Sequence, residues 1–251
     1  MNILEKIIKF LQFEMNKPTS YGWFHIMCLL ITIIVIYILI KKRPNLKKTI
    51  LSISVIMLLF EVYKQLSFSY SGEIWKYQWY AFPFQFCSIP MYVAFIAGIA
   101  KNKNIESFCY SFLATYGLVA GICVMFYPND VFVKETLINI QTMVHHGSMV
   151  IMGVYILSNK ILTNRKETFI KALSVFLVSV ALALLIDIST FYFHIDEGLK
   201  MFFISPYHKS TLPVFNIIYD KVPYAIFLLL YVLSFSTATS IPLLFVGERK
   251  K

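Results

Sequence analysis

Residues 21–40 have the sequence YGWFHIMCLLITIIVIYILI, which contains no Asp, Glu, Lys or Arg. A helix rises about 1.5 Å per residue, so a run of this length matches the roughly 30 Å hydrocarbon core of a bilayer. A positive cluster, Lys41–Arg43, follows immediately, as is typical where a helix leaves the membrane. The stretch predicts a transmembrane helix.

Further apolar runs of similar length follow along the chain. They lie near Thr49–Tyr70, Phe82–Ala100, Ser107–Tyr127, Leu137–Leu157, Thr168–Phe193 and Pro223–Leu243. Only 14% of the residues are charged, whereas a soluble domain carries roughly 25%. We therefore predict an all-α membrane protein with about seven transmembrane helices, a multi-pass protein of the cell membrane. Cys28, Cys87, Cys109 and Cys123 all fall in these apolar stretches, which argues against a disulfide framework.

Lys and Arg are unevenly distributed between alternate loops. One set has 14 members: Lys41–Arg43, Lys47, Lys48, Lys101, Lys103, Lys160, Arg165, Lys166, Lys171 and Arg249–Lys251. The other set has eight: Lys6, Lys9, Lys17, Lys76, Lys134, Lys200, Lys209 and Lys221. Positive loops stay in the cytoplasm, so we predict an external N-terminus and a cytoplasmic C-terminus. The net charge of +10 then reflects topology, and no nucleic-acid partner is expected.

Two segments outside the spans have characters of their own. Residues 1–18 place apolar and charged side chains on opposite helix faces, which predicts an amphipathic helix lying in the membrane interface. Residues 19–251 form the predicted transmembrane domain. Its longest connection, residues 194–222, is rich in aromatic and apolar residues, and we expect a lid or a re-entrant piece there.

Polar side chains within the spans are functional candidates, because ionisable groups are costly in hydrocarbon. They are Glu61, Lys64, Gln85, Cys87, Ser88, Gln141, His145, His146 and Asp187. Counted along the helices, they fall in one slice of the membrane near its predicted outer side. The pattern predicts a polar cavity that opens toward the outer leaflet.

Each of these residues also has a purely structural interpretation. Glu61 and Lys64, three residues apart, can neutralise each other as a buried pair. A lone intramembrane Cys is usually a small apolar filler, and His146, about 100° away from His145 on the helix, is more typical of a structural role. Asp187 can cap a helix or pair with Lys64 and take no part in any chemistry.

Cys87 and His145 together predict covalent chemistry. An imidazole can take the proton of a neighbouring thiol, and the thiolate can attack an ester carbonyl that enters from the lipid. Amide or hydroxyl groups of Gln85, Gln141 or Ser88 would stabilise the oxyanion. The acyl group would then pass from the sulfur to water or to a lysolipid hydroxyl.

Residues Phe82–Tyr92 have the sequence FPFQFCSIPMY. This run resembles the signature of the YwaF-like integral membrane family, in which a PL(H/Q)LC run opens a span. Four further features are similar to the pattern of that family: Glu61, Tyr116–Gly117, Tyr127–Pro128 and the HHG run at His145–Gly147. The resemblance covers roughly residues 20–245. That family looks like a bacterial relative of an animal acyltransferase that remodels ether phospholipids. The group in turn resembles the androgen-induced membrane hydrolases of fatty-acid esters, which use Thr and His.

The resemblance implies that Cys87 is the acyl-accepting nucleophile and that His145 is its base. The chain departs from the family at Gln85 and Ser88, where many bacterial members have His and Asp.

We predict an acyltransferase or lipid hydrolase without a cofactor that acts on phospholipid or lysophospholipid esters. The alternative is a small-solute or proton-coupled transporter that uses the buried Glu, Lys, Asp and His residues.

A metal site on Cys87, His145 and Glu61 or Asp187 lacks short ligand spacing, so no bound metal is predicted. If the protein were a receptor or an assembly protein without catalytic activity, Cys87 could be replaced by Ala without loss of function. A retinal-type receptor is disfavoured, since residues 223–243 contain no Lys. The sequence leaves the oligomeric state open.

Overall fold

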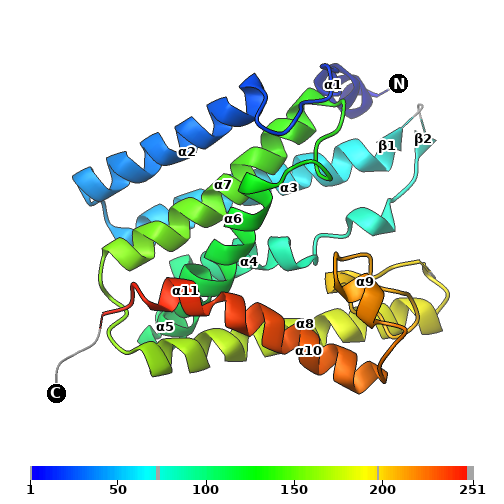
Figure 1. Cartoon of the computed structure of the whole chain (residues 1–251). Coiled ribbons are helices and arrows are strands. Elements are labelled where there is room, and N and C mark those ends of the chain that lie inside the picture. Colours follow the sequence, from blue (N-terminus) through cyan, green and yellow to red (C-terminus); the bar gives the residue numbers. More distant parts are fainter. Residues whose placement is uncertain (1, 72–73, 197, 248–251) are drawn as a thin grey trace.

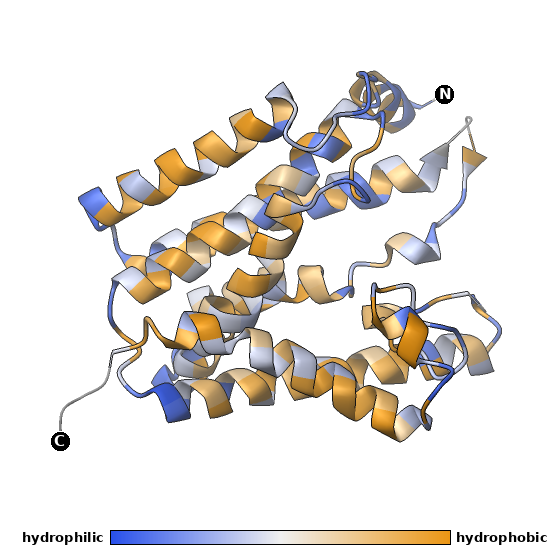
Figure 2. Ribbon diagram, viewed as in Figure 1, coloured by the Kyte–Doolittle hydropathy of each residue, from blue (hydrophilic) through white to orange (hydrophobic). Residues whose placement is uncertain are grey.

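Long helices form where the apolar runs lie. The computed structural model describes residues 2–71, 74–196 and 198–247. Six helical stretches in it are long and apolar enough to cross a membrane: Trp23–Lys42, Leu46–Ser69, Lys103–Phe126, Thr136–Ser158, Arg165–Tyr192 and Tyr224–Leu243. Their hydrophobic surfaces run along the bundle, and hydrophilic residues gather at its two ends (Figure 2). The prediction of an all-α membrane protein is confirmed.

The elements follow one another as a series of antiparallel helices (Figure 1). Their bounds are α1 Ile3–Leu11, α2 Trp23–Lys42, α3 Leu46–Ser69, β1 Tyr70–Ser71, β2 Ile74–Trp75, η1 Trp79–Ala81, η2 Phe86–Ser88, α4 Ile89–Ile99, α5 Lys103–Phe112, η3 Leu113–Gly117, α6 Leu118–Phe126, α7 Thr136–Ser158, α8 Arg165–Tyr192, η4 Met201–Phe203, α9 Phe215–Ile218, α10 Tyr224–Ala238 and α11 Ser240–Leu243. Helix α7 is central and packs against α2, α3 and α6, while α5 packs against α8.

The third expected span is shorter than the others. Its helical part covers Phe86–Ile99, about 21 Å at the usual rise, and the residues before it are not helical. Pro83 contributes to the late start, because a proline disfavours helical geometry in the residue before it, and the backbone of Phe82 is not helical, with ψ at 131°. Pro90 is tolerated because it lies in the first turn of α4, where a helix leaves its amides unpaired.

The two ends of the bundle are distinct. One end, here called the tryptophan end, carries α1, the β1–β2 hairpin, the 127–135 loop and the 194–222 segment, together with Trp23, Trp75 and Trp79. The other end carries the shorter connections between α2 and α3, α4 and α5, and α7 and α8. Arg249–Lys251, which contribute to the predicted positive side, lie outside the described residues, and the orientation stays a prediction.

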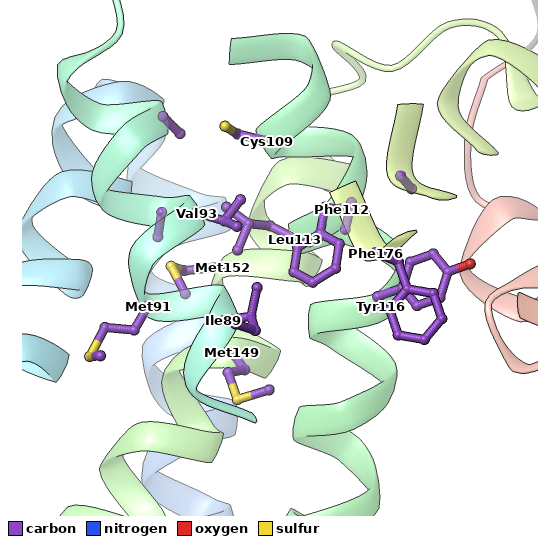
Figure 3. Close-up of a cluster of buried hydrophobic side chains, with 14 of the residues drawn as sticks. Ile89, Met91, Val93, Cys109, Phe112, Leu113, Tyr116, Met149, Met152 and Phe176 are labelled. Atoms are coloured by element: carbon purple, nitrogen blue, oxygen red, sulfur yellow. The ribbon is translucent and has the colours of Figure 1, made fainter. Parts of the chain in front are cut away.

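A buried core joins α4, the α5–α6 helix, α7 and α8 (Figure 3). Tyr116 and Phe176 stack with ring centroids 4.5 Å apart, and both side chains are fully buried. Directly before α6, residues Leu113–Gly117 form a π-helical turn, and Tyr116 in this turn belongs to the stack. The aromatic stack fixes α8 against the α5–α6 helix.

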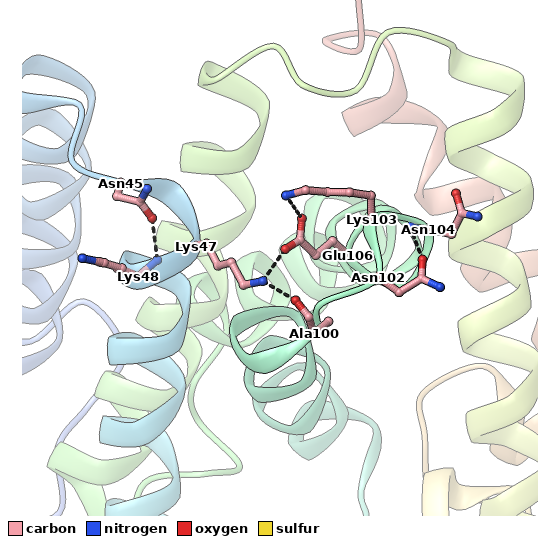
Figure 4. Close-up of polar contacts among 8 residues, drawn as sticks. All are labelled: Asn45, Lys47, Lys48, Ala100, Asn102, Lys103, Asn104 and Glu106. Carbon is pink, nitrogen blue, oxygen red and sulfur yellow. Dashed lines mark hydrogen bonds and ion pairs between the residues drawn. The ribbon is translucent and has the colours of Figure 1, made fainter.

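A charged network closes the end opposite the tryptophans (Figure 4). Buried Glu106 accepts from Lys47 at 2.5 Å and from Lys103 at 2.8 Å, and Lys47 also donates to the backbone oxygen of Ala100. Tyr155 donates to the Pro44 carbonyl at 2.5 Å. These bonds connect α3, α4, α5 and α7 where the chain turns, so we assign them a structural role.

The two segments outside the spans are ordered against the tryptophan end. Helix α1 begins with a capping box between Asn2 and Glu5 and exposes Ile3, Ile7 and Phe10. Its placement in a membrane interface stays a prediction. The 194–222 segment contains the short elements η4 and α9 and packs on α8 and α10.

Close packing of α7 against α6 leads to a test of this fold. A Cβ at Gly153 would meet Leu118 Cβ at 2.6 Å and the Leu113 carbonyl oxygen at 3.0 Å, whereas a Cβ at Gly117 has no neighbour nearer than 3.6 Å. Gly153→Ala should therefore destabilise the protein by about 1–3 kcal/mol through overpacking, and Gly117→Ala should leave it nearly unchanged. Thermal unfolding in detergent measures both, and equal melting temperatures would contradict the packing described.

Candidate functional site

Cys87 lies in the short turn η2, directly before α4. Its neighbour Phe86 is held among aromatic rings, with centroids 5.4 Å from Phe176 and 5.2 Å from Phe235. On the other side, Pro90 fixes the backbone of the first helical turn. The sequence around the cysteine thus anchors its backbone firmly from both directions.

His145, from the middle of α7, contacts the same turn. Its Nε2 lies 2.8 Å from the backbone oxygen of Cys87. A carbonyl oxygen can only accept, so Nε2 carries the hydrogen, and the lone pair of the neutral ring is on Nδ1. Nδ1 is buried and has no hydrogen-bond partner among the described residues. The arrangement leaves one ring nitrogen of His145 without a partner, and His145 and Cys87 line the same cavity.

A polar cavity of about 240 Å³ surrounds these two residues. Its walls include most of the side chains predicted for the site: Glu61, Lys64, Cys87, Ser88, Gln141, His145 and His146. They come from α3, the η2–α4 turn and α7. We call this space the Cys87 cavity.

Glu61 and Lys64 form an ion pair in the wall of the cavity. Their Oε1 and Nζ atoms are 2.9 Å apart, and the two side chains are 6% and 18% exposed. Gln65 donates to the same carboxylate oxygen at 2.7 Å and to the Ala81 carbonyl at 2.6 Å. The pair predicted as a structural possibility is therefore present, and both of its charges lie in the lining of the cavity that contains Cys87.

The α7 side of the cavity carries two further polar groups. His146 donates from Nδ1 to the Thr142 carbonyl at 2.8 Å, which fixes its ring, and it meets His145 edge to face at 5.4 Å. Gln141 accepts from the Thr142 hydroxyl at 3.4 Å through Oε1. Gln141 also lines the cavity, and its amide nitrogen makes no hydrogen bond to the residues that the structure describes.

The 127–135 loop covers the cavity. Asn139 holds this loop by two hydrogen bonds to the backbone of Val133, at 2.9 and 2.8 Å. Asp130, Val131 and Val133 line the space beneath it, and Asp130 is exposed. Asp130 was not predicted, because its place depends on the path of a loop, although it follows the Tyr127–Pro128 pair that closes the fourth span.

Gln85 and Asp187 do not line the cavity; both bind η4 instead. Gln85 accepts from the Phe202 amide at 3.1 Å and donates to the Lys200 carbonyl at 3.3 Å. Asp187 is buried and accepts from the Met201 amide at 2.6 Å. They hold the 194–222 segment against α4 and α8, so the Gln85 amide is committed away from the thiol.

Potential metal ligands are dispersed in the described part of the chain. No group of three or more His, Cys, Asp or Glu side chains is close enough to bind a metal ion there. Cys109 is buried in the core, and Cys28 and Cys123 lie on α2 and α6, away from the cavity.

The fold and the cavity define a multi-pass helical membrane protein with a polar cavity near one end of its bundle. The model of the TMEM164 family matches residues 16–243. The chain therefore belongs to the TMEM164 family, and the match includes every residue that lines the Cys87 cavity. Curated proteins and solved structures give no match to it.

Proposed function

We propose that this protein is an intramembrane acyltransferase or lipid hydrolase that uses Cys87 as nucleophile and His145 as base. The observation that carries the proposal is the hydrogen bond from His145 Nε2 to the Cys87 carbonyl. It leaves Nδ1 buried and without a partner among the described residues, in a residue that lines the same cavity as Cys87. A thiol needs a neighbouring base to become an effective nucleophile.

The reaction has two halves. His145 Nδ1 takes the thiol proton, Cys87 Sγ attacks the carbonyl carbon of an acyl ester, and the carbon–oxygen ester bond breaks. The leaving alcohol, a lysolipid, receives the proton from the imidazolium, and the acyl group stays on sulfur as a thioester. In the second half, His145 takes a proton from an acceptor hydroxyl, that oxygen attacks the thioester, and the thiolate leaves and regains the proton.

The oxyanion of each half needs positive charge or hydrogen-bond donors. Lys64 supplies a positive charge to the lining of the cavity, and Gln141 and Ser88 also line it. Gln85 does not take part in this version of the mechanism, because both ends of its amide bind η4. Among the donors predicted for the oxyanion, Gln141 and Ser88 remain.

The resemblance of the Phe82–Tyr92 run to the YwaF-like family supports the same reaction, since that family looks like a relative of an ether-phospholipid acyltransferase. Phospholipids and lysophospholipids are accordingly the proposed substrates, and the predicted orientation would present the cavity to the outer leaflet. The reaction needs no metal or organic cofactor.

Capture of the thioester tests the proposal. Protein in proteoliposomes is incubated with a phospholipid that carries a radiolabelled acyl chain, then denatured in acid. We expect label on the wild-type chain that neutral hydroxylamine removes, as it removes thioesters, and no label on Cys87→Ala. Cys123→Ala, which changes a cysteine outside the cavity, is the matched control and should retain the label. Equal labelling of the wild type and Cys87→Ala would refute the role of Cys87.

The transport alternative rests on the buried charges. Asp187 is engaged with Met201 and does not line the cavity with Glu61, Lys64 and His145, so these groups do not form one continuous relay. Two results together would favour transport over acyl transfer. One is solute or proton flux in the same proteoliposomes that is lost in Glu61→Gln, and the other is a wild-type chain that takes up no acyl label.

A further inference from the structure

A second polar pocket lies in the 194–222 segment at the tryptophan end. Its volume is about 580 Å³, and it shares no lining residue with the Cys87 cavity. Its polar lining consists of Lys200, His208, Lys209, Ser210, Thr211 and Asn216. We call it the Lys200 pocket.

The walls of this pocket are held in place by contacts to the bundle. Tyr207, next to His208, stacks on Phe191 of α8 with ring centroids 3.8 Å apart. Tyr219 donates its hydroxyl to the Ser205 carbonyl at 2.9 Å. Burial and the neighbouring Asp220 carboxylate raise the pKa of Tyr219. These contacts anchor the chain on both sides of the pocket, although most of its backbone is irregular.

Two nitrogen-bearing groups of the lining have no hydrogen-bond partner among the described residues. The Lys200 ammonium has no partner among the described residues, and His208 Nε2 is buried without one. Lys209 pairs with the exposed carboxylate of Asp220. Hydroxyl and amide groups complete the set, a combination typical of sites that bind oxyanions.

We propose that the Lys200 pocket binds the phosphate of a phospholipid head group. A phosphate offers several acceptor oxygens and negative charge to the unpartnered donors of Lys200 and His208. The same segment exposes apolar side chains beside the pocket, with Val214 62% and Ile217 58% exposed. Such side chains fit among acyl chains at a membrane interface, which favours a lipid over free phosphate as the source of the anion.

A direct connection links this pocket to the Cys87 turn. Gln85, two residues before Cys87, binds the Lys200 carbonyl and the Phe202 amide. Head-group binding at Lys200 would therefore hold the lipid next to the element that carries the thiol. This last step rests on the function proposed above, whereas phosphate binding itself does not.

Binding of a fluorescent short-chain phosphatidylglycerol to the purified full chain in a neutral detergent tests the pocket. The matched diacylglycerol, which lacks the phosphate, gives the baseline. We expect Lys200→Gln, which removes the charge, and His208→Leu, which removes the ring N–H, each to weaken phosphatidylglycerol binding by about tenfold, the effect of losing one charge-assisted hydrogen bond. Lys221→Gln makes the same charge change on an exposed residue of this segment outside the pocket, and should bind within about twofold of the wild type.

Three results would overturn the assignment. The first is wild-type affinity for diacylglycerol equal to that for phosphatidylglycerol, and the second is unchanged lipid binding in Lys200→Gln. The third is saturation of the pocket by inorganic phosphate that phosphatidylglycerol cannot displace, which would identify free phosphate as the ligand. Cys87→Ser should bind phosphatidylglycerol as the wild type does, so a failure of the acyl-transfer proposal leaves this measurement interpretable.

Discussion

Replacing His145 with glutamine is expected to slow acyl transfer by about 10²–10⁴-fold, the usual contribution of a general base. Glutamine can still donate to the Cys87 carbonyl, as His145 Nε2 does at 2.8 Å, so the packing of the η2 turn should survive. It has no group that can take a thiol proton, and this is the function removed. Initial rates of acyl transfer to a labelled lysophospholipid in proteoliposomes measure the effect.

His25→Gln provides the control. Both nitrogens of His25 are committed to backbone groups, since Nδ1 accepts from the Tyr21 amide at 2.8 Å and Nε2 donates to the Met125 carbonyl at 2.7 Å. Its loss should cost stability and leave the rate per folded molecule unchanged. A Cys87→Ala/His145→Gln double variant should be no slower than either single one, because the two residues act as a unit. A His145→Gln enzyme as fast as the wild type would exclude the base role.

The spans could be predicted because their signal is local. Hydrocarbon demands a continuous apolar run of a given length, and residues 21–40 satisfy that demand without reference to any other part of the chain. The same reasoning overestimated the helical length of the third span, where Pro83 delays the helix until Phe86. Nothing in hydropathy signals the π-turn at Leu113–Gly117, which depends on how Tyr116 stacks on Phe176.

The position of each candidate residue along its helix predicts that these residues lie at a similar depth in the membrane. Most of them do line one cavity. Depth does not state which way a side chain points around the helix axis. Gln85 and Asp187 fall in the same slice but turn toward Met201 and its neighbours. Their partners belong to a segment whose path follows from tertiary contacts, as does the place of Asp130.

The ion pair in the cavity wall gives the largest stability effect that we expect. Glu61→Leu removes the carboxylate that lies 2.9 Å from Lys64 Nζ and leaves the ammonium in a site only 18% exposed. Loss of one partner of a buried pair costs about 3–5 kcal/mol, because the remaining charge stays uncompensated, and the partial exposure of Lys64 places the expected cost near 3 kcal/mol. Thermal unfolding in detergent measures it.

Glu61→Leu/Lys64→Met separates the charge from the packing. Removing both charges together should restore most of the lost stability, since apolar replacements of a buried ion pair are often neutral or stabilising. The double variant should nevertheless remain slow in acyl transfer, because the cavity then lacks the positive charge that the proposed mechanism uses to stabilise the oxyanion. Recovery of stability without recovery of rate would show that the pair serves the chemistry. Recovery of both would reduce Glu61 and Lys64 to a structural pair and leave Gln141 and Ser88 as the proposed oxyanion donors.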